Sequence, residues 1–242
     1  MKKVAFYTLG CKVNQYETNA MIEKFINNKY EIVTFEEKAD IYVVNTCTVT
    51  NMSDRKSRQI IRRTKQLNYE SILVVTGCYA QVAREELEKI PEIDLIIGNT
   101  EKREIVALVE KLQKNKNKPI VSVSDINKEK NFTDFGTTTY TEKTRAVIKV
   151  QDGCNNFCTY CIIPYAKGRV RSRNFESVIE EIKNIVAKGI QEVVITGIHV
   201  ASYGIDFKEK NIRLIDLLEA INKIEGLKRI RLRLFRTKYN NR

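Results

Sequence analysis

Three cysteines lie close together in the segment Cys154-Asn-Asn-Phe-Cys158-Thr-Tyr-Cys161. This spacing allows three thiolates of one loop to converge on an inorganic centre. Four cysteines normally saturate an iron–sulfur cube, so three would leave one iron with an open coordination position. The motif therefore indicates an iron–sulfur cluster that binds a ligand at that iron, rather than one that only carries electrons.

A structural zinc site and three unrelated buried thiols are the alternatives for these cysteines. Zinc usually takes a fourth Cys or His ligand. The one histidine of the chain, His199, lies far beyond Cys161 in the sequence. We therefore favour the cluster over zinc.

The other three cysteines have no common local motif, but each follows a predicted strand. They are Cys11, Cys47 and Cys78, and Gly10 and Gly77 precede two of them. Because parallel strands end at one sheet edge, where ligands bind, we expect a second three-cysteine site there. The alternative is that these cysteines are small buried apolar residues. The two glycines fit sharp turns and a close approach of the backbone to a cofactor, and neither belongs to a dinucleotide-binding GxGxxG motif.

The elements that must position these residues alternate along the chain. In the first half, strands are expected at 4–9, 41–45, 71–76, 95–97 and 120–123, and helices at 14–27, 54–66, 81–89 and 103–113. Short apolar strands between helices indicate a buried parallel sheet, and we predict a flavodoxin-like α/β domain. In the second half, strands at 146–151, 192–196 and 229–234 and helices at 178–187 and 214–224 predict a partial (β/α) barrel with its site after the strand C-termini.

These elements divide the chain into an N-terminal domain at 1–119, a polar, Thr-rich linker at 120–143 and a barrel domain at 144–242. A complete (β/α)₈ barrel needs about 250 residues, so we expect this barrel to be incomplete. Arginines stand where a barrel interior would have apolar residues, at Arg231, Arg233 and Arg236. We therefore expect a truncated or frameshifted product with an unpaired edge strand.

Composition and charge limit the class of protein. Hydrophobic residues make up 43% of the 242 residues, which excludes a disordered chain. No apolar run reaches the roughly 20 residues that span a bilayer, and no signal peptide precedes Gly10, so we predict a cytoplasmic protein with reduced thiols. The net charge is +12, with 22 basic against 19 acidic residues in 1–140 and 20 against 11 in 141–242. This balance favours a nucleic-acid partner.

Together these motifs resemble one family, the radical S-adenosylmethionine (SAM) methylthiotransferases. The three N-terminal cysteine motifs and the SAM motif are similar to those of the family, and a further segment resembles the branch that modifies threonylcarbamoyladenosine in tRNA. In order, they are Gly10–Glu17, Asn45–Thr50, Thr76–Gln81, Cys154–Cys161 and Thr196–Gly204. The resemblance covers about residues 2–230. The C-terminal RNA-binding module of the family is not found, which again indicates truncation.

The resemblance implies a specific chemistry. Cys154, Cys158 and Cys161 would hold a [4Fe–4S] cluster whose free iron chelates SAM and whose electron generates a 5′-deoxyadenosyl radical. The first three cysteines would hold a second [4Fe–4S] cluster that carries the inserted sulfur, and a second SAM would supply the methyl group. The cofactors perform the difficult chemistry and the protein positions them. The implied substrate is C2 of the modified adenosine at position 37, in the anticodon stem-loop of tRNA. The implied protein is a monomer at full length and takes electrons from a donor such as flavodoxin or ferredoxin.

Other residues are weaker candidates for binding SAM or RNA. Tyr160 could lie near the adenine of SAM, or pack within its loop. Arg169, Arg171 and Arg173 would share one face of an extended segment and suit a carboxylate or phosphate, although a solvated surface is the alternative. His199 could lie on the substrate side or be an ordinary packed histidine. The predicted helix after Cys47 has basic residues that could contact the RNA backbone or simply face solvent: Arg55, Lys56, Arg58, Arg62, Arg63 and Lys65.

Three functions are consistent with the sequence. The first is a tRNA methylthiotransferase. The second keeps the chemistry but acts on another tRNA adenosine or on a ribosomal protein. The third is a non-catalytic iron–sulfur or tRNA-binding remnant.

Overall fold

The computed structural model describes residues 1–114, 119–135, 144–208 and 211–233. The first half of the chain forms a six-stranded parallel sheet in the order β2-β1-β3-β4-β5-β6. Its strands are β1 (Lys3–Thr8), β2 (Glu31–Val33), β3 (Ile41–Thr46), β4 (Ile72–Gly77), β5 (Leu95–Ile97) and β6 (Ile120–Ser122). The first five strands have the flavodoxin-like order, in which ligands bind where the strand order reverses, between β1 and β3.

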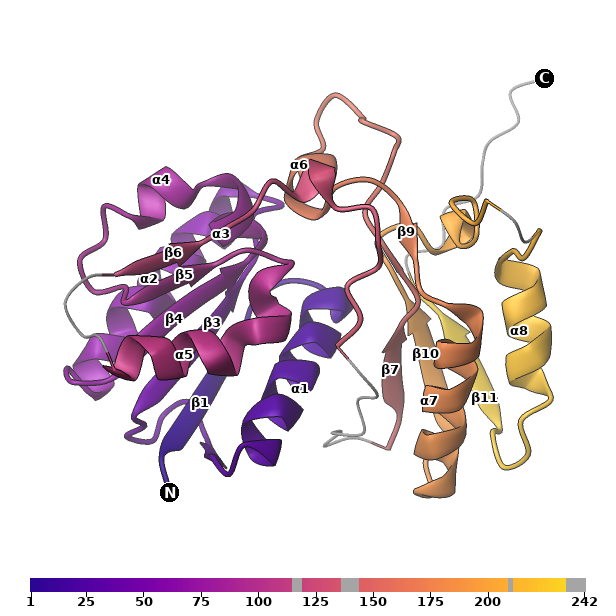
Figure 1. Ribbon diagram of the computed structural model, residues 1–242, viewed down its shortest axis with the longest axis horizontal. Coiled ribbons are helices and arrows are strands. Elements are labelled where there is room, and N and C mark those ends of the chain that lie inside the picture. Colours follow the sequence, from indigo (N-terminus) through magenta and orange to yellow (C-terminus); the bar gives the residue numbers. More distant parts are fainter. Residues whose placement is uncertain (115–118, 136–143, 209–210, 234–242) are drawn as a thin grey trace.

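Helices cover both faces of this sheet (Figure 1). On one face, α2 (Asn51–Leu67), α3 (Cys78–Val82) and α4 (Arg84–Leu87) pack on apolar residues of β3 and β4. On the other face lie α1 (Lys12–Asn27) and α5 (Ile105–Lys114), the latter preceded by the 3-10 helix η1 (Glu101–Glu104). β3 is buried along its whole length, as expected for a strand covered on both sides.

The second half contains a three-stranded parallel sheet in the order β11-β10-β7. The strands are β7 (Ala146–Lys149), β10 (Glu192–Thr196) and β11 (Arg229–Leu232), and α7 (Phe175–Ala187) and α8 (Leu214–Asn222) pack against them. Between β7 and α7 the chain forms α6 (Ile163–Lys167) and a short antiparallel pair, β8 (Gln151–Asp152) with β9 (Arg171–Ser172). Two 3-10 turns, η2 (Ile126–Lys128) and η3 (Val200–Ser202), complete the described elements. The predicted α/β class is confirmed.

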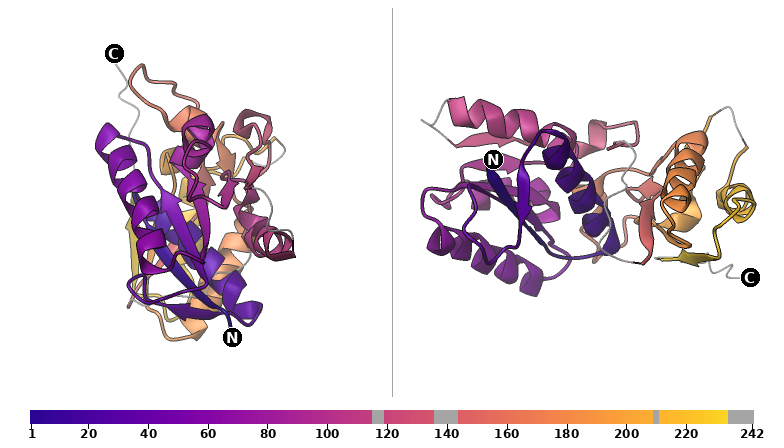
Figure 2. Two further views of the ribbon diagram at one scale, coloured as in Figure 1. Left: turned by 90° about the vertical axis from the view of Figure 1, so that its left-hand side faces the viewer. Right: turned by 90° about the horizontal axis from the view of Figure 1, so that it is seen from below.

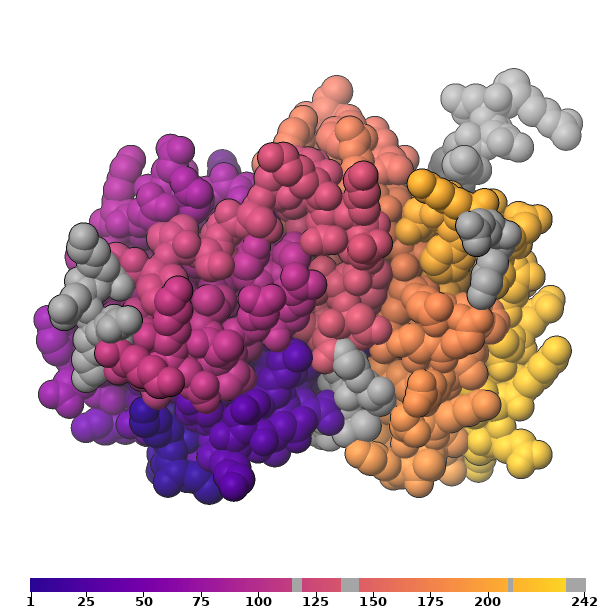
Figure 3. Space-filling model, in the orientation of Figure 1, coloured from indigo at the N-terminus to yellow at the C-terminus, as the bar shows by residue number. Residues whose placement is uncertain are grey.

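Helix α1 joins the two halves. Its buried residues do not follow a single stripe, because the helix packs on the first sheet on one side and on β7 on another. Tyr16 and Ala20 of α1 form a small apolar cluster with Phe135, and Val147 of β7 packs against it. Figure 2 shows α1 between the two sheets, and Figure 3 shows the two halves in contact over the face displayed.

Several predicted elements need correction. The single helix expected at 81–89 is two short helices, α3 and α4, because the backbone leaves the helical conformation at Ala83 (φ −124°, ψ 40°). The strand expected at 146–151 is interrupted at Val150 between β7 and β8. Residues 120–122, placed in the predicted linker, pair with β5 as the sixth strand of the first sheet. Residues 136–143 of that linker and Arg236 lie outside the described residues.

The arginines near the end of the described chain lie on the surface. β11 is largely exposed, and Arg231 and Arg233 are both exposed. Arg229 and Arg231 donate to the carboxylate of Glu192 on β10, at 3.1 and 2.5 Å. The charged side chains of β11 are therefore accommodated by solvent and by a pair with the neighbouring strand.

Candidate functional site

The first three cysteines follow three adjacent strands at one edge of the six-stranded sheet. Cys11 is the residue before α1, Cys47 follows β3, and Cys78 is the first residue of α3 after β4. The Leu9 amide donates to the Asn45 carbonyl at 2.9 Å, and Thr46 pairs with Gly77. These pairings deliver the cysteines to the edge formed by the C-terminal ends of the strands, as predicted.

The loops that carry these cysteines leave little room for side chains. Gly10 has φ +98°, and a Cβ there would lie 2.9 Å from Cys47 Sγ. Gly77 has φ +101°, and its Cβ would lie 2.3 Å from the Thr46 carbonyl oxygen. The Asn14 side-chain amide ties the loops together, because its Nδ2 donates to the carbonyls of Leu9 and Thr46 at 2.8 and 3.0 Å.

We expect Gly77→Ala to destabilise the chain by about 1–3 kcal/mol, the usual cost of a residue held in a disfavoured backbone region. The added methyl group meets backbone rather than a flexible side chain, so relief requires moving β3 or Cys78. Urea denaturation followed by circular dichroism measures the change. Gly189→Ala is the matched control, because Gly189 also has a positive φ (+88°) but has open space around its Cβ position. An equal loss in both variants would contradict the steric argument.

The thiols of this set differ in environment. Cys47 and Cys78 are 4% and 3% exposed, whereas Cys11 is exposed. Burial raises the pKa of the Cys78 thiol to about 12, despite the nearby ammonium groups of Lys167 and Lys102. Without a bound cation Cys78 is therefore a neutral thiol, and a metal would deprotonate it on coordination.

The second cysteine set lies in the loop between β8 and α6. The Cys154 amide donates to the Gly168 carbonyl at 3.0 Å, and the Cys161 amide donates to the Cys158 carbonyl at 2.9 Å. Gly153, with φ +70°, passes so close to the Arg169 backbone that a Cβ would overlap its carbonyl. All three thiols are partly exposed. The start of the loop is thus bonded to the residue after α6, and the three thiols remain accessible.

The arrangement of the cysteine side chains bears on which metal centre they fit. No group of three or more Cys, His, Asp or Glu side chains in the described ranges converges tightly enough to hold a metal ion. A mononuclear zinc site requires such convergence. A cube attaches each thiolate to a different iron, so its ligands need not meet at one point. Three thiols at one edge, without a fourth, fit a cluster better than zinc.

The remaining predicted residues are scattered around these sets. Tyr160, in the loop of the second cysteine set, is 81% exposed. His199 donates its backbone amide to Gln151 Oε1 at 2.7 Å, and its ring Nδ1 shares a hydrogen bond with the Ser202 hydroxyl. Gln151 in turn donates to the carbonyls of Asp152 and Gly153, which connects His199 to the strand end before Cys154.

The three arginines after the second cysteine set differ in exposure. Arg169 is exposed and its guanidinium lies 4.3 Å from the centre of the Phe157 ring. Arg171 and Arg173 are each 1% exposed, so the solvated-surface alternative is wrong for both. Arg173 is held by an ion pair with Glu181. Arg171 Nη2 donates to the Lys167 carbonyl at 2.9 Å and lies 3.8 Å from Asp152 Oδ2. Among the described residues, its buried Nε and Nη1 have no hydrogen-bond partner.

The basic residues of α2 line a groove beside the first cysteine set. Arg55, Arg58, Arg62 and Arg63 border it together with Gly10, and its volume is about 1110 Å³. Arg58 donates to the Tyr79 hydroxyl at 2.7 Å, and Arg63 pairs with Glu36 at 3.4 Å. Arg55 and Arg62 are exposed.

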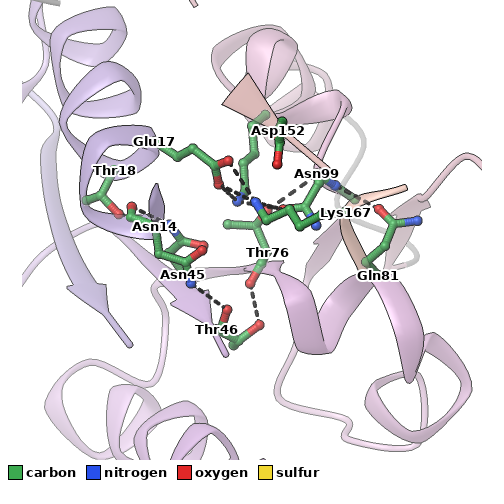
Figure 4. Close-up of polar contacts among 12 residues, drawn as sticks. Asn14, Glu17, Thr18, Asn45, Thr46, Thr76, Gln81, Asn99, Asp152 and Lys167 are labelled. Carbon is green, nitrogen blue, oxygen red and sulfur yellow. Dashed lines mark hydrogen bonds and ion pairs between the residues drawn. The ribbon is translucent and has the colours of Figure 1, made fainter. Parts of the chain in front are cut away.

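Sequence reasoning missed a buried charged cluster between the two halves, shown in part in Figure 4. Glu17 of α1 is 1% exposed and forms ion pairs with Lys149 and Lys167, each at 2.7 Å, and with Lys102. Lys149 also pairs with Asp152 at 2.5 Å. Asn99 Oδ1 accepts from Lys102 and Lys167 at 2.8 and 3.1 Å. One signal was available, since a lysine within a buried parallel strand, such as Lys149, requires a charged partner.

The charges in this cluster hold one another ionised. Burial would raise the pKa of Glu17, but Lys102, Lys149 and Lys167 outweigh it and hold that pKa well below the ordinary value. Burial likewise opposes ionisation of Asp152, whose pKa is lowered by the same kind of contact with Lys149. Burial lowers the pKa of Lys102 to about 8.

Comparison with known proteins follows the same division of the chain. A family model described as "Uncharacterized protein family UPF0004" matches residues 3–98, and the model of the radical SAM superfamily matches residues 148–238. A protein of Aquifex aeolicus, named threonylcarbamoyladenosine tRNA methylthiotransferase MtaB, is 48% identical over 95% of this chain and 55% of its own length. A Bacillus subtilis protein with the same name is 45% identical over 96% of this chain and 51% of its own length. The chain thus spans about half the length of these curated relatives.

Solved structures agree on the fold alone. The radical SAM methyltransferase TsrM from Kitasatospora setae superposes with a TM-score of 0.60 at 13% identity, over 90% of this chain and 50% of that chain. No helix within the described ranges has the length and apolarity to cross a membrane. With both family models in chain order and close relatives along nearly its whole length, the chain belongs to the radical SAM methylthiotransferase family.

Proposed function

We propose that the protein is a tRNA methylthiotransferase that uses two [4Fe–4S] clusters and SAM to methylthiolate C2 of N6-threonylcarbamoyladenosine at position 37. One observation carries this proposal. Helix α3, which begins at Cys78, packs against α6, which begins two residues after Cys161. The two cysteine sets therefore lie at one junction, where a cluster that cleaves SAM and a cluster that carries sulfur could serve one substrate.

In this proposal Cys154, Cys158 and Cys161 hold one cluster, and Cys11, Cys47 and Cys78 hold the other. The clusters supply the electron that cleaves SAM and the sulfur that is inserted. The residues of the chain supply position and charge. Gly10 and Gly77 let the backbone pass close to the first set. Arg171, whose Nε and Nη1 have no hydrogen-bond partner among the described residues, is proposed to donate to a carboxylate such as that of SAM.

The choice of nucleoside is supported by sequence similarity. Relatives named for threonylcarbamoyladenosine are 48% and 45% identical to the chain. A relative named tRNA-2-methylthio-N(6)-dimethylallyladenosine synthase, from Moorella thermoacetica, is 34% identical. We therefore propose the former substrate, a cytoplasmic location and a flavodoxin- or ferredoxin-type electron donor. His199, at the end of β10 and linked through Gln151 to the cluster loop, is proposed to face the substrate.

Anaerobic reconstitution with iron and sulfide tests the proposal. We expect about eight iron atoms per chain, as two cubes require, and formation of 5′-deoxyadenosine from SAM. Mass spectrometry of the nucleosides of treated tRNA is expected to show the methylthio product. Clusters without SAM cleavage would favour a non-catalytic remnant, and a chain that binds no iron would refute the proposal.

We further propose that the α2 groove contacts the RNA backbone. Neutralising two phosphate contacts with Arg55→Gln and Arg62→Gln should weaken binding of an anticodon stem-loop and reduce the slope of log K against log salt by about 1.8, or 0.9 per duplex phosphate. Fluorescence anisotropy at several salt concentrations measures both quantities. The control removes two exposed lysines, Lys183 and Lys223, which line a groove between α7 and α8. An equal loss of slope in that control would show that only net charge matters.

A further inference from the structure

Glu17 lies near the first cysteine set in the sequence and forms ion pairs with residues that flank the second set. It lies in α1, which begins at the residue after Cys11. Its partner Lys149 ends β7, shortly before Cys154, and its partner Lys167 ends α6, shortly after Cys161. One carboxylate thus bonds to both flanks of the second cysteine loop from the helix that begins at the first set.

A second polar contact reinforces this link from the neighbouring residue of α1. The Tyr16 hydroxyl accepts from Arg173 Nη1 at 3.1 Å and lies 3.4 Å from Glu181 Oε2. Asn99, which belongs to the first half, also donates to the Ala166 carbonyl of α6 at 2.7 Å. The junction of the two halves therefore includes several fully buried, directional contacts besides the small apolar cluster around Tyr16 and Ala20.

Stability alone does not explain so many buried charges. Replacing a buried ion pair with well-packed apolar residues is often neutral or stabilising, whereas hydrogen-bonded charges accept only a narrow range of geometries. The ammonium groups of Lys149 and Lys167, both bonded to the Glu17 carboxylate, tie β7 and α6 to α1 in one relative placement. Apolar contacts such as those around Tyr16 and Ala20 have no preferred direction and so do not by themselves select one placement.

We propose that Glu17 is a positioning residue that fixes the sheet edge of Cys11, Cys47 and Cys78 relative to the loop of Cys154, Cys158 and Cys161. This role rests on the proposed function, in which sulfur and radical must meet at one substrate carbon. Lys149 and Lys167 are its partners across the junction. Lys102 lies within the first half and holds the carboxylate from its own side.

The difference between these lysines provides the test. Spin labels are introduced with non-canonical amino acids at two exposed positions, Gln66 on α2 and Lys183 on α7, and their distance distribution is measured by pulsed electron paramagnetic resonance in the metal-free chain. Glu17→Gln and Lys167→Met should broaden or shift the distribution. Lys102→Met, which removes a buried lysine of the same size without cutting a contact across the junction, should leave it unchanged.

An unchanged distribution in folded Glu17→Gln and Lys167→Met chains would overturn the proposal, as would equal broadening in Lys102→Met. If Glu17→Gln does not fold, Lys167→Met decides the outcome, because Lys149 still pairs with Glu17 in that variant. The measurement needs no cluster, so its result stands even if the proposed function fails.

The reconstituted chain supplies a second readout. Cleavage of SAM uses only the Cys154–Cys161 set and should persist in Lys167→Met. Transfer of sulfur to tRNA needs both sets in register and should fall by about tenfold or more, since a misplacement of about 1 Å can cost two orders of magnitude. Equal loss of both activities would indicate general disruption and contradict a positioning role.

Discussion

Replacing Glu17 by glutamine is expected to lower the free energy of unfolding by about 3–5 kcal/mol, the range for removing one partner of a buried ion pair. The amide cannot neutralise the three ammonium groups of Lys102, Lys149 and Lys167, all of which are at most 1% exposed. These groups would then repel one another at low dielectric. Urea denaturation, followed by circular dichroism and by tyrosine fluorescence because the chain has no tryptophan, measures the change.

The matched control is Glu36→Gln. Glu36 pairs with Arg63 at 3.4 Å, but both side chains are about half exposed (62% and 45%), and exposed pairs contribute about 0–1 kcal/mol. A loss for Glu17→Gln as small as that of the control would show that the buried cluster rearranges or admits water. That result would also weaken the case for a fixed junction.

The dependence of stability on pH has a definite sign for Glu17. Its pKa in the folded chain lies well below the ordinary value of 4.5, so the unfolded chain binds more protons as the pH falls below that value. The stabilisation is therefore complete above about pH 4.5 and is lost as the pH falls through the folded pKa. In Glu17→Gln the free energy of unfolding should fall less steeply as the pH is lowered. Some loss should remain, because the pKa of Asp152 is also lowered. An unchanged slope of the free energy of unfolding against acidic pH would contradict a lowered pKa for Glu17.

How far the sequence predicts the site depends on the range of the interactions involved. The cysteine loops were predictable because each follows a short apolar strand, and parallel strands end at a common edge. The residues Thr46 and Gly77 that flank two of the cysteines are register partners, which is a direct consequence of that rule. Strand order itself was less accessible, since β2 has only three residues.

The junction between the two halves could not be predicted in the same way. Glu17 and Lys167 are separated by 150 residues, and no local sequence pattern around either residue predicts that they pair. A glutamate in a helix such as α1 is ordinarily expected to face solvent. Glu17 is buried only because β7 and α6 pack near that helix. The different exposure of Arg169 and Arg171 has a related cause. Alternation indicates which residues share a strand face, but β9 has only two residues, Arg171 and Ser172, so Arg169 lies outside the strand and is exposed.

Serine substitutions in the two cysteine sets are expected to have the largest effects on function and to separate the two clusters. Cys158→Ser should reduce the iron content after reconstitution from about eight to about four atoms per chain, the loss of one cube. It should also reduce formation of 5′-deoxyadenosine to background, because the cluster that binds SAM is lost. Cys47→Ser should lose the same amount of iron but continue to cleave SAM, and only the methylthio product on tRNA should disappear.

Both substitutions replace a thiol with a hydroxyl, but the two cysteines differ in burial, so the comparison needs a control for folding. Cys158 is partly exposed in its loop, whereas Cys47 is 4% exposed against Gly10, so circular dichroism must first show that Cys47→Ser is folded. Iron counting, a SAM cleavage assay and nucleoside mass spectrometry on the same preparations give the three readouts. Loss of SAM cleavage in a folded Cys47→Ser chain would mean that the sets do not act separately. Retention of eight iron atoms in either variant would remove that cysteine from the ligand set, and with it the assignment of one cluster to each cysteine set.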